Sequence, residues 1–91
     1  MESTKAKRYA VLDELSQGQR ERLLYLEMHL WFSGAIGRRD LETRFGIKPA
    51  AASRDLAAYR ELAPKNLEYD TSDRCYRVAK AFHPVFEYAT D

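Results

Sequence analysis

Apolar residues recur at helical spacing along the first third of the chain, and they predict two helices. A short helix is expected over residues 6–15, where apolar side chains fall at every third position. Ser16, followed three residues later by Gln19, has the pattern of a capping box, which opens a helix. The second helix therefore begins after Ser16 and ends at Ser33 and Gly34. The apolar positions of the first helix are Tyr9, Leu12 and Leu15.

The second predicted helix is apolar around almost its whole circumference. Three apolar stripes run along it, and only Arg20, Glu21, Arg22 and Glu27 interrupt them. Because such a helix is buried on more than one side, something must cover its extra face. Either the first short helix covers that face, or a second subunit or another domain does. The stripes consist of Leu23, Leu26 and Leu30, of Leu24, Met28 and Trp31, and of Tyr25, His29 and Phe32.

The following segment predicts a helix-turn-helix. A two-turn helix over residues 38–45 ends at Gly46, a residue that allows the left-handed backbone conformation common at helix ends. A second helix starts at Pro49, which suits a first helical turn, and runs to about Ala63. Three alanines at positions 50–52 keep the start of this helix narrow. A short helix, a short turn and a helix with a narrow start are typical of a helix-turn-helix.

Two short alternating stretches near the C-terminus predict a β-hairpin. They cover residues 67–69 and 75–78, and the polar residues 70–73 between them are typical of a turn. The side chains expected to pack are Tyr69, Tyr76 and Val78. Three helices followed by a hairpin is the order of elements in a winged helix-turn-helix. The expected fold class is therefore mainly α with a small β-hairpin, in which the hairpin is a wing beside the recognition helix.

The composition agrees with one small domain and excludes several classes of protein. A chain of 91 residues that is 45% hydrophobic supports a single core and is too apolar for intrinsic disorder. Cys75, His29 and His83 lack the spacing of a metal site, so we expect no metal and no cofactor. No apolar run approaches the roughly 18–20 residues of a membrane span. Neither a phosphate-binding glycine loop nor a catalytic set is present. A cytoplasmic, non-enzymatic protein is expected.

The formal net charge of +1 is distributed unevenly along the chain. Residues 38–60 hold six basic and three acidic side chains, which gives this segment +3 and leaves −2 for the rest. The positive charge therefore lies on the predicted helix-turn-helix, where a DNA-binding domain needs cations to contact phosphates. Asp55 would repel phosphate if it were exposed. We expect it to be a structural partner of a nearby arginine or of the wing.

Exposed positions of the predicted elements give candidate DNA contacts. Arg54 is the candidate for a bidentate contact to a guanine edge, with Ser53 beside it. Ala50 or Ala51 is placed to touch a thymine methyl group. Four basic residues are expected to contact the backbone, and the last of them lies at the wing tip, within reach of a narrow minor groove. They are Arg38, Arg39, Lys48 and Arg74.

Several stretches of the chain resemble a known family. They read RRDL at 38–41, FGI at 45–47, ASRDLAAY at 52–59, LAPKNLEYD at 62–70, Tyr76, and FHPVF at 82–86. With them, residues 16–86 resemble the N-terminal winged-helix domain of WYL-domain transcription regulators, in particular repressors of anti-phage defence systems of the CapW and BrxR type. The resemblance implies a repressor that binds double-stranded DNA as a homodimer on a palindromic operator.

The same resemblance implies a division of the chain. Residues 1–15 are expected to be a tail and short helix, residues 16–80 the winged helix-turn-helix, and residues 81–91 an extension toward a ligand-sensing WYL domain that this chain lacks. No small-molecule ligand is therefore expected here. Lys48 and Pro49 stand where this family often has a small hydroxyl cap, so Lys48 itself is expected to supply a phosphate contact.

A second class of function stays open, in which the winged helix mediates protein–protein contact and does not bind DNA. The stretch 81–88 carries three aromatic residues outside the hairpin, and with the apolar second helix it forms an expected self-association or inter-domain surface. We expect a dimer through these elements. The basic content of residues 38–60 and the narrow start of the recognition helix favour DNA binding over the second class.

Overall fold

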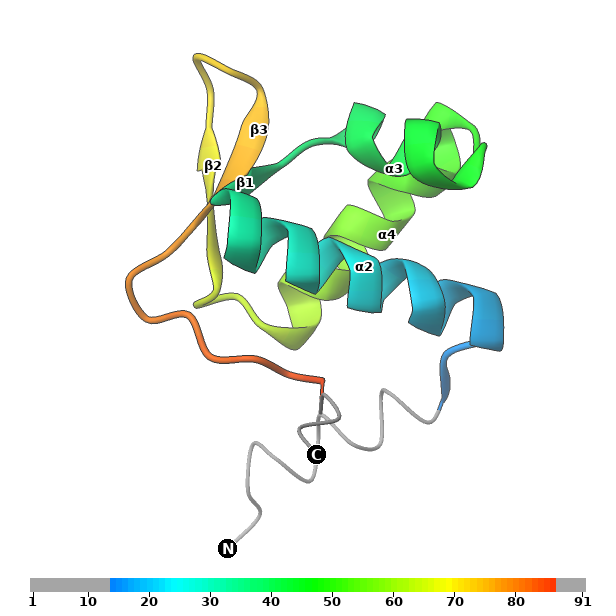
Figure 1. The fold of residues 1–91 in the computed structure, drawn as a ribbon, viewed down its shortest axis with the longest axis horizontal. Coiled ribbons are helices and arrows are strands. Elements are labelled where there is room, and N and C mark those ends of the chain that lie inside the picture. Colours follow the sequence, from blue (N-terminus) through cyan, green and yellow to red (C-terminus); the bar gives the residue numbers. More distant parts are fainter. Residues whose placement is uncertain (1–13, 87–91) are drawn as a thin grey trace, which may run out of the picture.

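The computed structural model describes residues 14–86, and the expected helix at 6–15 lies almost entirely outside them. The described elements are, in chain order, α2 (Gln17–Ser33), β1 (Ala35–Ile36), α3 (Arg38–Phe45), α4 (Pro49–Leu62), β2 (Leu67–Asp70) and β3 (Cys75–Val78). Figure 1 shows that the wing formed by β2 and β3 rises on the same side of the molecule as α3. Both ends of the described chain lie on the opposite side. No helix in the described part is long and apolar enough to cross a membrane.

The helix boundaries follow the predicted signals. The Ser16 hydroxyl accepts a hydrogen bond from the Gln19 backbone N–H at 3.2 Å and so caps α2. Gly34 and Gly46 end α2 and α3 in the left-handed conformation, with φ of 85° and 64°. Helix α4 starts at Pro49, as expected, and Lys48 at its N-cap makes no side-chain capping bond.

The wing belongs to a three-stranded sheet with the strand order β1-β3-β2. Tyr69 lies opposite Tyr76 in the expected hairpin. Strand β1, which the sequence did not indicate, pairs Ile36 with Tyr76 on the other edge of β3. Two residues are too short a stretch to show alternation, so no periodic signal marks this strand. Its pairing fixes the base of the wing against the connection between α2 and α3.

The core forms between α2, α4 and the sheet. One predicted stripe of α2, Leu23, Leu26 and Leu30, is fully buried. Tyr76 and Val78 pack against the core, as expected, but Tyr69 is 52% exposed. Tyr69 therefore packs on the ring of Tyr76 in the neighbouring strand and not into the core. It lies above Tyr76, and their ring centroids are 5.0 Å apart.

A buried polar cluster ties the last described segment to the helices. The Glu27 carboxylate is fully buried and accepts hydrogen bonds from the Tyr59 hydroxyl at 2.6 Å and from the backbone N–H groups of Val85 and Phe86 at 2.8 and 3.1 Å. The Asn66 amide binds the Tyr59 hydroxyl and both backbone groups of His83. The sequence suggested Glu27 as a polar interruption of an apolar helix, whereas it is the centre of this cluster.

Candidate nucleic-acid interface

The exposed face of α4 carries most of the residues predicted to read bases. Ser53, Arg54 and Ala50 are exposed, and Ala51 is half-buried. Lys48 is also exposed, directly before the first turn of α4. Each position is thus accessible to a ligand that approaches this face of α4.

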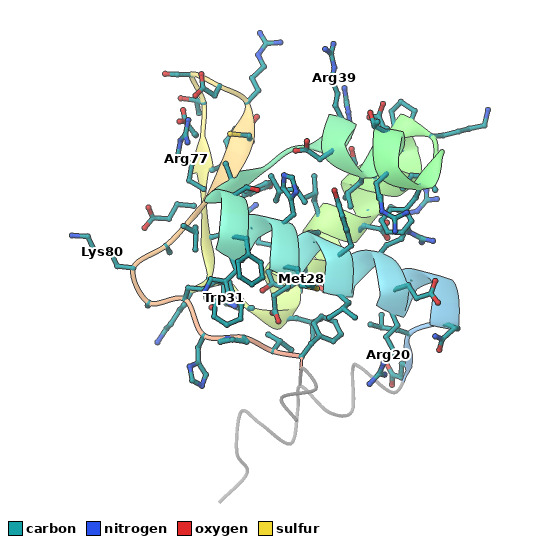
Figure 2. All side chains as sticks on the ribbon, in the orientation of Figure 1. Arg20, Met28, Trp31, Arg39, Arg77 and Lys80 are labelled. Atoms are coloured by element: carbon teal, nitrogen blue, oxygen red, sulfur yellow. The ribbon has the colours of Figure 1, made fainter. Side chains whose placement is uncertain are left out.

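A groove of about 680 Å³ lies between α3, α4 and the wing. Three of the residues predicted to contact the DNA backbone line this groove, together with Ser53 of α4. They are Arg38 and Arg39 from the start of α3 and Arg74 from the wing. Figure 2 shows Arg39 pointing away from the helices on the side of the molecule where the wing turn also lies. Residues distant in the sequence therefore form one basic surface. Lys48 and Arg54 do not line this groove.

Most acidic side chains near the groove already have partners. Asp40 accepts a hydrogen bond from the Gly37 backbone N–H at 2.8 Å and so caps α3. Glu42 pairs with Arg38 at 3.0 Å. By contrast, Arg39 and Arg74 have no ion-pair or hydrogen-bond partner among residues 14–86. Two arginines are thus available to an anion on opposite walls of the groove.

The wing turn is held by a cluster of charged residues. The Asp70 carboxylate accepts hydrogen bonds from the backbone N–H groups of Ser72 and Asp73 and from Arg77, whose guanidinium also pairs with Asp73. The Arg77 hydrogen bond, followed by the Asp73 backbone N–H, holds the pKa of Asp70 below its usual value. Arg74, the last residue of this turn, has a φ of 54° and so lies in the left-handed region, which is unfavourable for a residue with a side chain.

Asp55 is part of the scaffold behind the exposed face of α4. Its carboxylate is buried and pairs with Arg22 of α2, with Nε and Oδ2 2.5 Å apart. The expectation of a structural arginine partner is confirmed. Because Asp55 points into the helix pair, its negative charge does not lie on the face that carries Arg54.

Tyr69 and Gly37 are among the groove residues that the sequence did not indicate as DNA contacts. Tyr69 was predicted only as a packing residue, yet it also lines the groove. Gly37 also lines it, at the N-cap of α3, close to the wing residue Cys75. The exposure of Tyr69 depends on how far the helices extend under the wing, which the alternation of β2 does not reveal.

A helix pair with a tight turn, a wing of two strands and a third strand packed at its base define a winged helix-turn-helix domain. More particularly, residues 18–90 match the BrxR transcriptional regulator winged helix-turn-helix domain, and the chain belongs to that family. Both the predicted fold class and the resemblance to the BrxR and CapW type are confirmed.

Several similar proteins carry the name DNA-binding transcriptional repressor CapW. One from Escherichia coli (strain KTE188) is 48% identical over 69 residues, and one from Pseudomonas aeruginosa is 44% identical over 69 residues. In both cases the alignment covers 76% of this chain and 23% of the relative. A third, from Stenotrophomonas maltophilia, is 41% identical over 68 residues, which are 75% of this chain and 23% of the relative. The chain thus matches about a quarter of the length of these relatives.

Proposed function

We propose that this chain is a sequence-specific, non-enzymatic binder of double-stranded DNA, with α4 in the major groove and the wing on the backbone or minor groove. The observation that carries the proposal is a pair of arginines, Arg39 and Arg74, on opposite walls of a groove beside the exposed face of α4. Neither has an ion-pair or hydrogen-bond partner within the described part of the chain. A face that binds DNA needs such cations to contact phosphates, whereas an apolar protein contact does not depend on them.

The proposed contacts divide into two kinds. Arg54 contacts a guanine edge, Ser53 lies beside it, and Ala50 or Ala51 meets a thymine methyl group. The other four residues bind phosphates, which fix the register of α4 without reading sequence. They are Arg38, Arg39, Lys48 and Arg74. The accessibility of these positions, from exposed to half-buried, supports both roles.

We further propose that the chain acts in the cytoplasm as a homodimer on a palindromic operator and that the outcome is repression, in the context of phage defence. The name of its relatives supports repression. The proposed organisation is a tail and helix at 1–15, the winged helix at 16–80, and an extension at 81–91 toward a sensing domain. In that arrangement small-molecule effectors act outside this domain.

An exposed aromatic surface supports the proposed dimer. Trp31 stacks on Phe32 with 5.4 Å between ring centroids, and the ring centroid of Phe82 lies 5.5 Å from that of Trp31. Phe32 is 75% exposed, although apolar side chains of this size are usually buried. Figure 2 shows Trp31 and Met28 on the side of α2 that faces away from Arg39 and the wing turn. A partner on this surface would leave the basic groove open.

The experiment that tests DNA binding begins with a random-sequence duplex library, from which the protein selects its preferred sequence. Binding to the selected duplex, of roughly 20–30 base pairs to hold two half-sites, is then compared with a scrambled duplex. The test variant is Arg39→Ala, which removes one positive charge from the groove. Its charge-matched control is Lys80→Ala, which removes one positive charge from an exposed position away from the groove. We expect Arg39→Ala alone to weaken binding. Equal affinity for both duplexes, or equal losses in both variants, would contradict the proposal.

A further inference from the structure

We infer that Tyr69 is a contact of the wing to the DNA backbone, in which its hydroxyl donates to a phosphate oxygen and its ring packs on the adjacent sugar. This inference rests on the proposed DNA binding and adds an uncharged contact to it. Tyr69 lines the same groove as Arg39 and Arg74 and is 52% exposed. DNA bound along this groove would therefore meet Tyr69 as well as the two arginines.

The position of the Tyr69 ring is fixed before any ligand binds. Tyr69 and Tyr76 are direct cross-strand partners, and their rings meet edge to face at 64° with 5.0 Å between centroids. Tyr76 is itself held because it packs against the core and its strand pairs on both edges, with β1 and with β2. A tyrosine has few rotatable bonds, so a ring held in this way loses little entropy on binding.

The core does not account for the exposure of Tyr69. A side chain whose role was to cover Tyr76 would need an apolar ring and no hydroxyl. No hydrogen bond to the Tyr69 hydroxyl occurs within residues 14–86, in contrast to the Tyr59 hydroxyl, which binds Glu27 and Asn66. Tyrosine hydroxyls are among the neutral groups that proteins use to bind DNA phosphates. The two arginines supply charge, and Tyr69 supplies a fixed donor in the same groove.

An uncharged contact has a signature that separates it from Arg74. Each cation that neutralises a phosphate releases counterions and steepens the dependence of affinity on salt, whereas a hydroxyl does not. Tyr69→Phe keeps the ring on Tyr76 and removes only the donor. We expect it to weaken binding about 3- to 10-fold, equally on selected and scrambled duplexes, with an unchanged salt slope. Tyr69→Ala also removes the ring and should lose more.

The control is Tyr25→Phe, which removes the same atom from a half-buried tyrosine of α2 outside the groove. It should bind within about twofold of wild type. A duplex in which single phosphates are replaced by neutral methylphosphonates identifies the contact. At one such position, Tyr69→Phe should cause no further loss.

Several outcomes would overturn the inference. If both Tyr69 variants bind DNA with wild-type affinity, Tyr69 does not contact the DNA, and the proposed function is unaffected. A loss of affinity for the selected duplex alone would show that Tyr69 contacts a base and not the DNA backbone. Absence of wild-type binding to any duplex would overturn the proposed function and, with it, this contact. If Tyr69→Ala fails to fold, Tyr69→Phe still decides, because it preserves the packing on Tyr76.

Discussion

Arg22 of α2 donates to Asp55 of α4 across the helix pair, with 2.5 Å between Nε and Oδ2. The two side chains differ in burial, since 2% of the Asp55 side chain is exposed and 24% of that of Arg22. Asp55 follows Arg54 directly in the chain, so the pair fixes the orientation of the helix turn that presents Arg54. A residue that holds the helices together, Asp55, is therefore the direct neighbour of a proposed DNA contact, Arg54.

The unequal burial predicts unequal effects of removing each partner. Arg22→Ala leaves a buried carboxylate without its cation and should lower the free energy of unfolding by about 2–4 kcal/mol. Asp55→Ala leaves a guanidinium that can turn to water and should cost less, about 1–2 kcal/mol. Chemical denaturation followed by the fluorescence of Trp31, the single tryptophan, measures both. Equal losses in the two variants would show that burial does not govern the pair.

Glu27 gives a second stability prediction. In Glu27→Gln the amide oxygen can still accept from the Tyr59 hydroxyl and the Val85 N–H, but the amide nitrogen then faces the Phe86 N–H, a second donor. The Phe86 N–H is then a buried donor without an acceptor, which should lower the free energy of unfolding by about 1–3 kcal/mol. Hydrogen exchange at the Val85 and Phe86 amides should accelerate first. Glu68→Gln on the exposed wing is the matched control and should change neither quantity.

The elements that the sequence revealed are those with local signals. Ser16, Gly46 and Pro49 mark helix boundaries through capping and backbone preferences that involve few neighbours. By contrast, no short-range pattern joins Glu27 to Val85 or Arg22 to Asp55, because these contacts depend on how the helices pack. Asp55 was recognised as structural from its charge alone, but its partner was not.

The candidate site divides in the same way. Arg54 and the basic positions of α3 follow from helix periodicity, and the structure places them on accessible surface. The groove itself was not predictable, because it forms where the wing, positioned by β1, stands beside α3 and α4. The exposure of Tyr69 and its place in the groove were not predictable for the same reason. Alternation shows which residues share a face of a hairpin but not how much of that face the helices cover.

Asp70 predicts how the stability of the wing depends on pH. Its pKa is held below the usual 3.8, mainly by the hydrogen bond from Arg77, so its ionised form is favoured in the folded state. The stabilisation is present above the unfolded pKa and is lost as the pH falls through the folded pKa. Wild type should be more stable than Asp70→Asn at about pH 6, and this difference should shrink once the pH falls below about 4. Denaturation at a series of pH values measures it, and a constant difference would contradict the assignment.

Substitutions of Arg54 and of Lys48 should weaken DNA binding in different ways. Arg54→Ala removes a proposed base contact, so it should cost about 1–3 kcal/mol on the selected duplex and relax the preference at one base pair. Lys48→Ala removes a proposed phosphate contact and should weaken selected and scrambled duplexes alike, with a salt slope smaller by about 1. Titrations at several salt concentrations on both duplexes distinguish the two. An equal loss for Arg54→Ala on both duplexes would refute its base-reading role.

Substitutions of Arg74 should affect stability and DNA binding separately, because its backbone has an unfavourable conformation while its side chain lines the groove. Arg74→Ala removes the guanidinium and keeps a Cβ in the left-handed region at φ 54°, whereas Arg74→Gly removes both. Both variants should lose the same DNA affinity and reduce the salt slope by about 1. The glycine variant should nevertheless be about 1 kcal/mol more stable than the alanine variant, since glycine adopts positive φ without steric cost. Thermal unfolding and salt titrations of the two proteins measure both quantities. Equal stability would show that the turn does not strain Arg74, and undiminished DNA affinity would exclude it from the interface.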